Sequence, residues 1–391
     1  MRKTRLPEGG TNLFQEIKAV SAQAQKNGSV LIKLSIGQPS GPALISARTT
    51  AARAVESDAE AMHEYQDNGS PGVPDFAERF VAAHLCGHVF EEGTVDYLPI
   101  PGIKPMLGLI PLACGEDLSL VATTTNPGYP TPKDWCRYLG KLVFEPGLNS
   151  ENNFLFDPQE LNGREVGLVM TNYPHNPSGA VASREWLENL CSYCESHNIR
   201  IFNDAAYAAL KYDSDSCLLS EVANQFPDLS WVEAFSASKL IGNGTGWRVG
   251  AMVGSPDFIG DIKTIKGNTD SGFVAPMALG ALYAAEHDPE IANIADLYHQ
   301  RSIALCQALS EAGMRLATQP KAGFFTLWQT PKQAFGREIK DARDFNFAMI
   351  EKTGIVGVHF GKYIRYSVAC VDTIGMADEI EKAFESAEIS Y

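Results

Sequence analysis

The stretch FSASKLIGNGTGWRVG, residues 235–250, carries only two charged side chains, Lys239 and Arg248, with three glycines between them. A solvated loop usually carries more charge than this, and a buried loop rarely carries a lysine. A lysine amine with few charges around it loses its proton more readily and becomes a nucleophile. The stretch also continues an apolar run that predicts a buried strand. We therefore interpret Lys239 as a nucleophilic lysine at the end of a strand.

Apolar runs that end in Gly, Pro, Asn or Asp alternate with helical patterns around this stretch. The runs are nearly continuous, which is typical of strands buried on both faces of a parallel sheet. They cover residues 95–100, 118–123, 166–173, 199–207, 231–238 and 249–254, with helical patterns over 104–114 and 185–198. Together they predict a mostly parallel α/β sheet with helical crossovers.

The pattern changes after about residue 280. Long helices are predicted over 278–313, followed by strands at 324–329 and 363–369 and helices at 344–354 and 376–389. The run VLIKLSIG, residues 30–37, is predicted to be a strand that follows a helix over 10–28. We expect an N-terminal arm and part of a small domain over 1–40, a large cofactor-binding domain over 41–285, and a C-terminal small α+β domain over 286–391.

Composition limits the classes of function. The chain has 391 residues and a net charge of −15, which argues against a nucleic-acid-binding surface. We predict neither a signal peptide in the basic N-terminus nor a membrane span. Eight scattered cysteines form no disulfide framework, so a cytoplasmic setting is expected. Cys191, Cys194 and His197 would share one helical face without a second ligand pair, and we predict no metal site.

Polar side chains follow several of the predicted strands. Because ligands of open α/β sheets bind at the carboxyl ends of the strands, we expect these side chains to meet at one site. They are Lys104, Tyr129, Asn176, Asp204, Tyr207, Ser236, Ser238 and Lys239, and Gly102 and Ile103 form the turn before Lys104.

Several common motifs are absent. The third glycine of a dinucleotide-binding fingerprint is replaced by Trp247, and neither a complete P-loop nor a G-x-S-x-G elbow is found. A lysine that forms a Schiff base with an aldehyde cofactor remains. Arg248, serine hydroxyls and the N–H groups of the helix opened by Pro105 would bind a cofactor phosphate. Asp204 would pair with a pyridinium nitrogen.

In their order along the chain, these motifs resemble those of the class I/II aminotransferases of the aspartate aminotransferase superfamily. The resemblance rests on LSIGQPSGP (34–42), PGIK (101–104), NPGYPTP (126–132), NYPHNPSG (172–179), NDAAY (203–207) and IRYS (364–367), and it spans nearly the whole chain. Its most specific part is S-x-S-K…G-W-R-x-G with D-x-x-Y upstream. It implies a fold-type I pyridoxal-phosphate (PLP) enzyme, with a mostly parallel seven-stranded sheet and a smaller α+β domain.

The resemblance implies a role for each residue at the cofactor ring. Lys239 would form the Schiff base with pyridoxal 5'-phosphate and later carry the substrate proton. Asp204 would pair with the pyridine nitrogen, Tyr207 and Asn176 would hold the phenolic oxygen, and Tyr129 would stack on the ring.

The resemblance also assigns the phosphate and the substrate. The phosphate would be bound by Gly102, Ile103, Lys104, Ser236, Ser238 and Arg248, with Tyr65 reaching the phosphate of the partner subunit. Arg365, helped by Gly37 and Asn176, would bind the α-carboxylate of the substrate. The implied enzyme is a homodimer with shared sites that moves an amino group from an L-amino acid to a 2-oxo acid by a ping-pong mechanism.

Two alternatives and two departures from the family pattern stay open at this point. A β-lyase or elimination enzyme would use the same residues, and a non-catalytic regulator could share the scaffold. The spacing from Lys239 to Arg248 is one residue longer than the family's usual spacing. The distal arginine of aspartate-specific members has no evident counterpart in IKGNTDSG, residues 265–272, where Lys266 is a candidate clamp. The amino donor and the oxo acceptor are not identified.

Overall fold

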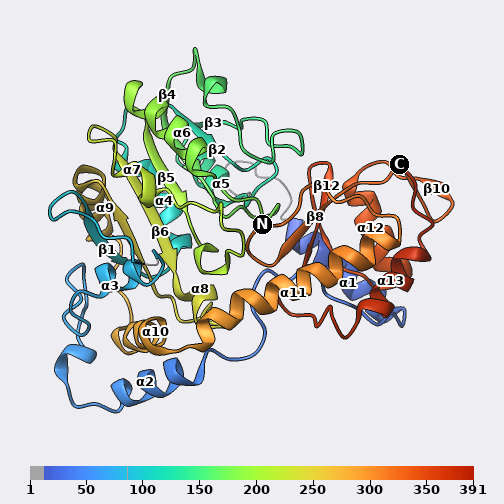
Figure 1. The fold of residues 1–391 in the computed structure, drawn as a ribbon, viewed down its shortest axis with the longest axis horizontal. Coiled ribbons are helices and arrows are strands. Elements are labelled where there is room, and N and C mark those ends of the chain that lie inside the picture. Colours follow the sequence, from blue (N-terminus) through green and yellow to red (C-terminus); the bar gives the residue numbers. More distant parts are fainter. Residues whose placement is uncertain (1–12, 86) are drawn as a thin grey trace, which may run out of the picture.

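The computed structural model describes residues 13–85 and 87–391, which form a large and a small lobe (Figure 1). The large lobe contains a seven-stranded sheet in the order β1-β7-β6-β5-β4-β2-β3. Its strands are β1 (Asp96–Ile100), β2 (Leu120–Thr123), β3 (Leu142–Phe144), β4 (Val166–Thr171), β5 (Arg200–Asp204), β6 (Trp231–Ser236) and β7 (Gly250–Gly254). β7 runs antiparallel to both of its neighbours, and the other adjacent pairs are parallel. The predicted mostly parallel α/β sheet is confirmed.

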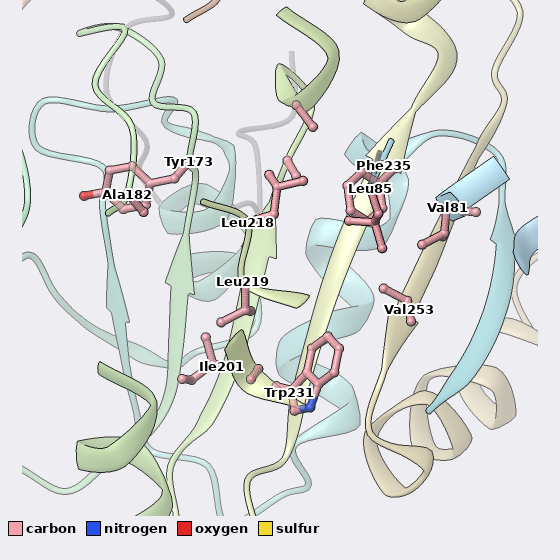
Figure 2. Packing of buried hydrophobic residues seen from close by; sticks show 14 of the residues in the cluster. Val81, Leu85, Tyr173, Ala182, Ile201, Leu218, Leu219, Trp231, Phe235 and Val253 are labelled. Atoms are coloured by element: carbon pink, nitrogen blue, oxygen red, sulfur yellow. The ribbon is translucent and has the colours of Figure 1, made fainter. Parts of the chain in front are cut away.

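The sheet is buried on both faces, which explains the nearly continuous apolar runs. In β5, Ile201 belongs to one hydrophobic core and Phe202 to the core on the opposite face. Figure 2 shows Ile201, Trp231 and Val253 on the first face, together with Val81 of the adjoining helix. The helices of that face are α3 (Phe76–Ala82), α6 (Arg184–Ser196), α7 (Ser220–Ala223) and α10 (Ala275–His287), and the opposite face carries α4 (Ile103–Ala113), α5 (Thr131–Tyr138) and α9 (Pro256–Lys266).

The small lobe is built around a three-stranded antiparallel sheet. Its strands are β11 (Val358–Phe360), β12 (Tyr363–Ser367) and β8 (Phe325–Gln329), with β12 in the centre, beside a short hairpin of β9 (Gln333–Ala334) and β10 (Arg337–Glu338). The surrounding helices are α1 (Leu13–Lys26), α12 (Ala342–Thr353) and α13 (Ala377–Glu385). The long helix α11 (Glu290–Glu311) runs from the large lobe to the small one (Figure 1).

The remaining elements are short or lie at the lobe surface. They are α2 (Ile45–Val55), α8 (Ala237–Leu240), η1 (Glu60–Met62), η2 (Pro158–Leu161) and η3 (Ala208–Leu210). Helix α2 packs along α10 on the large lobe. Within the described residues, no helix is both long and apolar enough to cross a membrane. The N-terminal residues 1–12, where we predict no signal peptide, lie outside the described part of the chain.

The strand predicted over residues 30–37 is wrong. Within this segment, Ile32 forms an isolated bridge to Ile355. The segment runs beside β12, where Ser367 N–H donates to Leu34 O at 2.6 Å, but the next two carbonyls bind side chains: Arg365 donates to Ser35 O at 3.0 Å, and Ser367 Oγ donates to Ile36 O at 2.7 Å. Strands β3 and β11 were not foreseen, because three residues give too short a periodic signal.

Candidate functional site

A cavity of about 360 Å³ opens at the carboxyl ends of the central strands and is closed by the small lobe. It brings together the following predicted residues: Gly37, Ile103, Lys104, Tyr129, Asn176, Asp204, Tyr207, Ser236, Ser238, Lys239, Arg248 and Arg365. Gly102 adjoins the cavity through Arg248. Tyr65 does not line it, and 78% of that residue's surface is exposed.

Lys239 lies on the short helix α8, which follows β6 directly. Ser236 caps this helix, because its Oγ accepts a hydrogen bond from the Ser238 N–H at 3.1 Å. The Lys239 ammonium lies 5.3 Å from the centre of the Tyr207 ring. Burial lowers the pKa of Lys239 to about 8, the nearby Asp204 opposes this shift, and Arg248 adds to it. The amine is therefore partly neutral near physiological pH, as a nucleophile requires.

Asp204 is the last residue of β5 and is buried. Its Oδ1 accepts a hydrogen bond from the Ala206 N–H at 3.1 Å. Burial raises its pKa to about 6, while Lys239 and the Ala206 N–H act in the opposite direction. A buried carboxylate with a single hydrogen bond is suited to pair with a further cation, such as a protonated ring nitrogen.

The N-terminus of α4 and Arg248 form a cradle for an anion. Gly102 caps α4 with a φ of +80°, and a Cβ at this position would lie 2.4 Å from Arg248 Nη2. The guanidinium donates to Thr245 O at 3.0 Å and to Pro101 O at 3.1 Å, which holds it beside the free N–H groups of the helix. Helix N-termini and guanidinium groups both bind phosphate.

The extra residue between Lys239 and Arg248 is accommodated in a turn. Leu44 N–H donates to Ile241 O at 2.9 Å, and Asn243 Nδ2 donates to Gly41 O at 3.0 Å, so the turn is attached to the segment before α2. Arg248 itself adopts a φ of +57°. The longer spacing therefore leaves the Arg248 guanidinium in the cavity wall.

Arg365 lies in the central strand of the small lobe and is only 3% exposed. Its Nη1 donates to Asn176 Oδ1 at 2.9 Å and its Nη2 to Ser35 O, while its Nε has no hydrogen-bond partner. No carboxylate of the described residues forms a salt bridge with it. Burial lowers its pKa to about 10, so the guanidinium stays charged at neutral pH. An unneutralised buried guanidinium is suited to a carboxylate ligand.

Lys266 is not among the residues that line the cavity. Its side chain is fully buried, and its ammonium donates to Asp270 Oδ1 at 2.7 Å and to Asn68 Oδ1 at 3.2 Å. The cation is thus already paired within its own chain, and the structure does not bring this candidate clamp into the site.

Sequence reasoning missed several residues of the cavity wall, namely Phe14, Ile36, Gln38, Leu107, Asn172, Ala206, Thr245 and Phe325. Asn172 opens the NYPHNPSG motif, so its position at a strand end was an available signal. Phe14 and Phe325 come from the small lobe, and no local pattern shows that they face the large one.

The donor set fits pyridoxal phosphate. The cavity offers an amine for the aldehyde at Lys239, a carboxylate for the ring nitrogen at Asp204, and an anion cradle that a side chain at Gly102 would fill. The unpartnered Nε of Arg365 adds a donor for a substrate carboxylate. The described residues contain no group of three or more His, Cys, Asp or Glu residues arranged to hold a metal ion.

Comparisons with known proteins identify the family of the chain. The sequence profile of the family "Aminotransferase class I and II" matches residues 29–381. The LL-diaminopimelate aminotransferase of Methanocaldococcus jannaschii is 29% identical over 374 residues, which cover 92% of this chain and 86% of that protein. The enzyme of the same name from Dehalococcoides mccartyi is 28% identical over 384 residues, covering 95% and 94%.

Solved structures show the same fold. An aminotransferase from Mycobacterium tuberculosis superposes with a TM-score of 0.82 at 23% identity, covering 99% of both chains. The aspartate aminotransferase of Thermotoga maritima gives a TM-score of 0.79 at 21% identity, covering 97% of this chain and 99% of that one. The prediction of a fold-type I enzyme is confirmed, and the named relatives favour transamination over elimination. The chain belongs to the class I and II aminotransferases and is a pyridoxal-phosphate-dependent transaminase.

Proposed function

We propose that this transaminase works by a ping-pong mechanism in which Lys239 both holds the cofactor aldehyde and moves the substrate proton. The observation that carries the proposal is the placement of Lys239, with its pKa near 8, in one cavity with Asp204 and Arg365. When bound, the cofactor accepts the amino group at its aldehyde carbon and draws electrons from the Cα–H bond into its ring.

Each side chain then has a separate task. Arg365 binds the α-carboxylate of the amino acid, and Asn176, which accepts a hydrogen bond from its Nη1, fixes the direction of the guanidinium. The Lys239 amine, when not bound to the aldehyde, would act as the general base that takes the proton from the substrate Cα and then as the general acid that gives it to the cofactor's former aldehyde carbon. Asp204 would keep a proton on the ring nitrogen. Tyr207 and Asn176 would hold the phenolic oxygen.

The same proposal assigns the phosphate. The N–H groups at Gly102, Ile103 and Lys104, the hydroxyls of Ser236 and Ser238, and the Arg248 guanidinium would bind it, while Tyr129 would stack on the ring. Arg248 and Lys104 both line the cavity, which supports this assignment.

We further propose LL-diaminopimelate as the first amino donor to test, with a 2-oxo acid as acceptor. The support is that the relatives that match over nine-tenths of the chain are named for this substrate.

A homodimer with shared active sites is also proposed. Tyr65 projects from its own lobe rather than into its own cavity. The large lobe also exposes apolar side chains on α2, α10 and the adjoining loops: Ile45, Val55, Val274 and Tyr283. Ile45 of α2 and Tyr283 of α10 line one groove on this face. A second copy that covers this face would exclude apolar surface from water and bring Tyr65 toward the second cavity.

We place the protein in the cytoplasm, because the cysteines of the described residues are free thiols, as is usual in a reducing compartment. We place the domain boundaries at 1–40, 41–285 and 286–391, supported by separate hydrophobic cores in the two lobes.

The proposed function is tested by presenting the purified holoenzyme with amino donors and 2-oxoglutarate in turn. The panel contains LL-2,6-diaminopimelate, aspartate, an aromatic amino acid and an aliphatic one. We expect each accepted donor to bleach the yellow absorbance of the bound cofactor and 2-oxoglutarate to restore it. Bleaching should be fastest with diaminopimelate. Release of ammonia and pyruvate without an acceptor would instead identify a lyase. A faster half-reaction with another donor would overturn the substrate assignment alone.

A further inference from the structure

Strands β4 and β5 lose their regular pairing where the site begins. The last paired residues are Thr171 and Asn203. Asp204 is aligned with Ala234 of β6, and Pro174 has no N–H to donate. The backbone ladder therefore cannot by itself fix the end of β4 against the end of β5.

Two asparagine side chains, Asn172 and Asn203, replace the missing ladder. Asn203 Oδ1 accepts from Tyr173 N–H at 2.9 Å, and its Nδ2 donates to Tyr173 O at 2.9 Å. The same Nδ2 also donates to the buried Glu233 at 2.7 Å. Glu233 in turn is held by Ser220, whose N–H and hydroxyl both donate to its Oε2.

Asn172 makes the bonds nearest to the cofactor site. Its Nδ2 donates to Asp204 O at 2.7 Å, and its Oδ1 accepts from the Asn176 N–H at 3.1 Å. Its own N–H donates to Thr124 Oγ1 at 3.1 Å. The residue is 8% exposed and lines the cavity. One side chain thus connects the backbones of the residues proposed to contact the ring nitrogen and the phenolic oxygen of the cofactor.

We propose that Asn172 is a positioning residue that fixes Asp204 relative to Asn176 and so tunes the electronic state of the bound cofactor. The inference rests on the proposed roles of Asp204 and Asn176. Removal of the amide would leave the Asp204 carbonyl and the Asn176 N–H without partners in a buried place, and both strand ends would shift to find new ones. In a site of low dielectric, small shifts of a carboxylate change its interaction energy strongly.

The test replaces Asn172 with alanine and follows the pH midpoint of the bound cofactor's absorbance change. The absorbance changes when the bound cofactor loses a proton that is not the one on the ring nitrogen. A positively charged ring nitrogen and a hydrogen bond to the phenolic oxygen both favour that loss. A misplaced Asp204 weakens the first effect, and a misplaced Asn176 weakens the second. We expect the midpoint to rise by about half a pH unit or more, and the dissociation constant for the cofactor to increase. Asn172→Ser, which leaves a hydroxyl and a smaller cavity, is the second variant if the first folds poorly.

Asn346→Ala is the matched control. Asn346 is also buried. Its Nδ2 donates to Gly357 O at 3.1 Å, and its Oδ1 accepts from the Gly357 N–H at 3.1 Å, both within the small lobe. Its loss should lower thermal stability as much as the loss of Asn172 but leave the midpoint unchanged. If both variants move the midpoint equally, or if neither does, the proposal is overturned.

Asp204→Asn separates this proposal from the one it rests on. If Asp204→Asn fails to move the midpoint, the role of Asp204 is wrong and the role of Asn172 falls with it. If Asp204→Asn moves the midpoint and Asn172→Ala does not, only the positioning role of Asn172 is refuted.

Discussion

Lys239 and Asp204 illustrate how burial and charge oppose each other at one site. Burial pushes the pKa of the amine down to about 8 and that of the carboxyl up to about 6, while each group's charge pulls its partner back. The sequence could predict the amine's environment, because charge is scarce for several residues on both sides of Lys239. The effect of Asp204 on the pKa of Lys239 depends on the pairing of β5 with β6, which cannot be predicted from a local sequence pattern.

The lowered pKa of Lys239 predicts a pH dependence for cofactor attachment. Only the neutral amine attacks the aldehyde, and its fraction rises as the pH passes upward through about 8. The rate of absorbance change after apoenzyme is mixed with pyridoxal phosphate should therefore increase from pH 7 to pH 9 and then level off. A rate that keeps rising tenfold per pH unit up to about pH 10 would indicate a lysine with its ordinary pKa.

The planar guanidinium of Arg365 is predicted to control binding of the amino-acid donor. Arg365→Lys keeps the charge but loses the two-pronged contact, which should lower kcat/KM for the donor about a hundredfold, equivalent to about 3 kcal/mol. The absorbance of the bound cofactor should not change. Arg343→Lys serves as the control, because Arg343 pairs with Glu16 on the surface. Equal kcat/KM for Arg365→Lys and the unmodified enzyme would refute the carboxylate assignment.

At the scale of elements, the sequence predicted the strands that are buried on both faces and failed where hydrogen bonding replaces regular pairing. The runs at 166–173, 199–207 and 231–238 became β4, β5 and β6 because apolar residues on both faces meet helices. Residues 30–37 have a similar composition, but after one backbone bond to Leu34 O the side chains of Arg365 and Ser367 bind the next two carbonyls, and no ladder forms. Which carbonyls will meet a distant side chain cannot be inferred from one segment.

Helix α4 offers a prediction with a control at its other end. Gly102 precedes the helix with a φ of +80° and Gly115 follows it with a φ of +88°. Alanine at either position costs about 1 kcal/mol of backbone strain. Only at Gly102 would the new Cβ meet another group, Arg248 Nη2 at 2.4 Å, whereas at Gly115 it meets nothing within 4 Å.

Gly102→Ala should therefore weaken cofactor binding at least about tenfold, and Gly115→Ala should leave it unchanged. Titration of the two apoenzymes with pyridoxal phosphate gives both dissociation constants. If the two variants bind the cofactor equally well, the N-terminus of α4 is not the phosphate site.

For the whole molecule, the sequence predicted two structural units but not how they close one cavity. Phe325 and Arg365 come from the small lobe and Asp204 from the large one, and all three line the same space. Long-range placement of this kind depends on α11 and on the segment 37–44, which connect the small lobe to the large one. Tyr65 is the extreme case, since its predicted role lies in a second copy of the chain.

Shared sites predict complementation between two defective subunits. Lys239→Ala removes the amine and Tyr65→Ala removes the phosphate contact, so at limiting cofactor each variant alone should have little activity. In a mixed dimer, one site combines an intact Lys239 with an intact Tyr65 from the other subunit. Unfolding and refolding the two variants together should therefore restore part of the activity. A mixture no more active than the sum of its parts would place Tyr65 and Lys239 in the same subunit's site, or Tyr65 in none.

The half-reaction of Lys239→Ala with an amino donor tests the central claim most directly. The variant is loaded with pyridoxal phosphate, and the bleaching of its absorbance after donor addition is followed in a stopped-flow instrument. Because Lys239 is proposed to carry the proton, the rate should fall by about a thousandfold or more, and added primary amines of small size should restore part of it. Bleaching at the rate of the unmodified enzyme would contradict the assignment of Lys239.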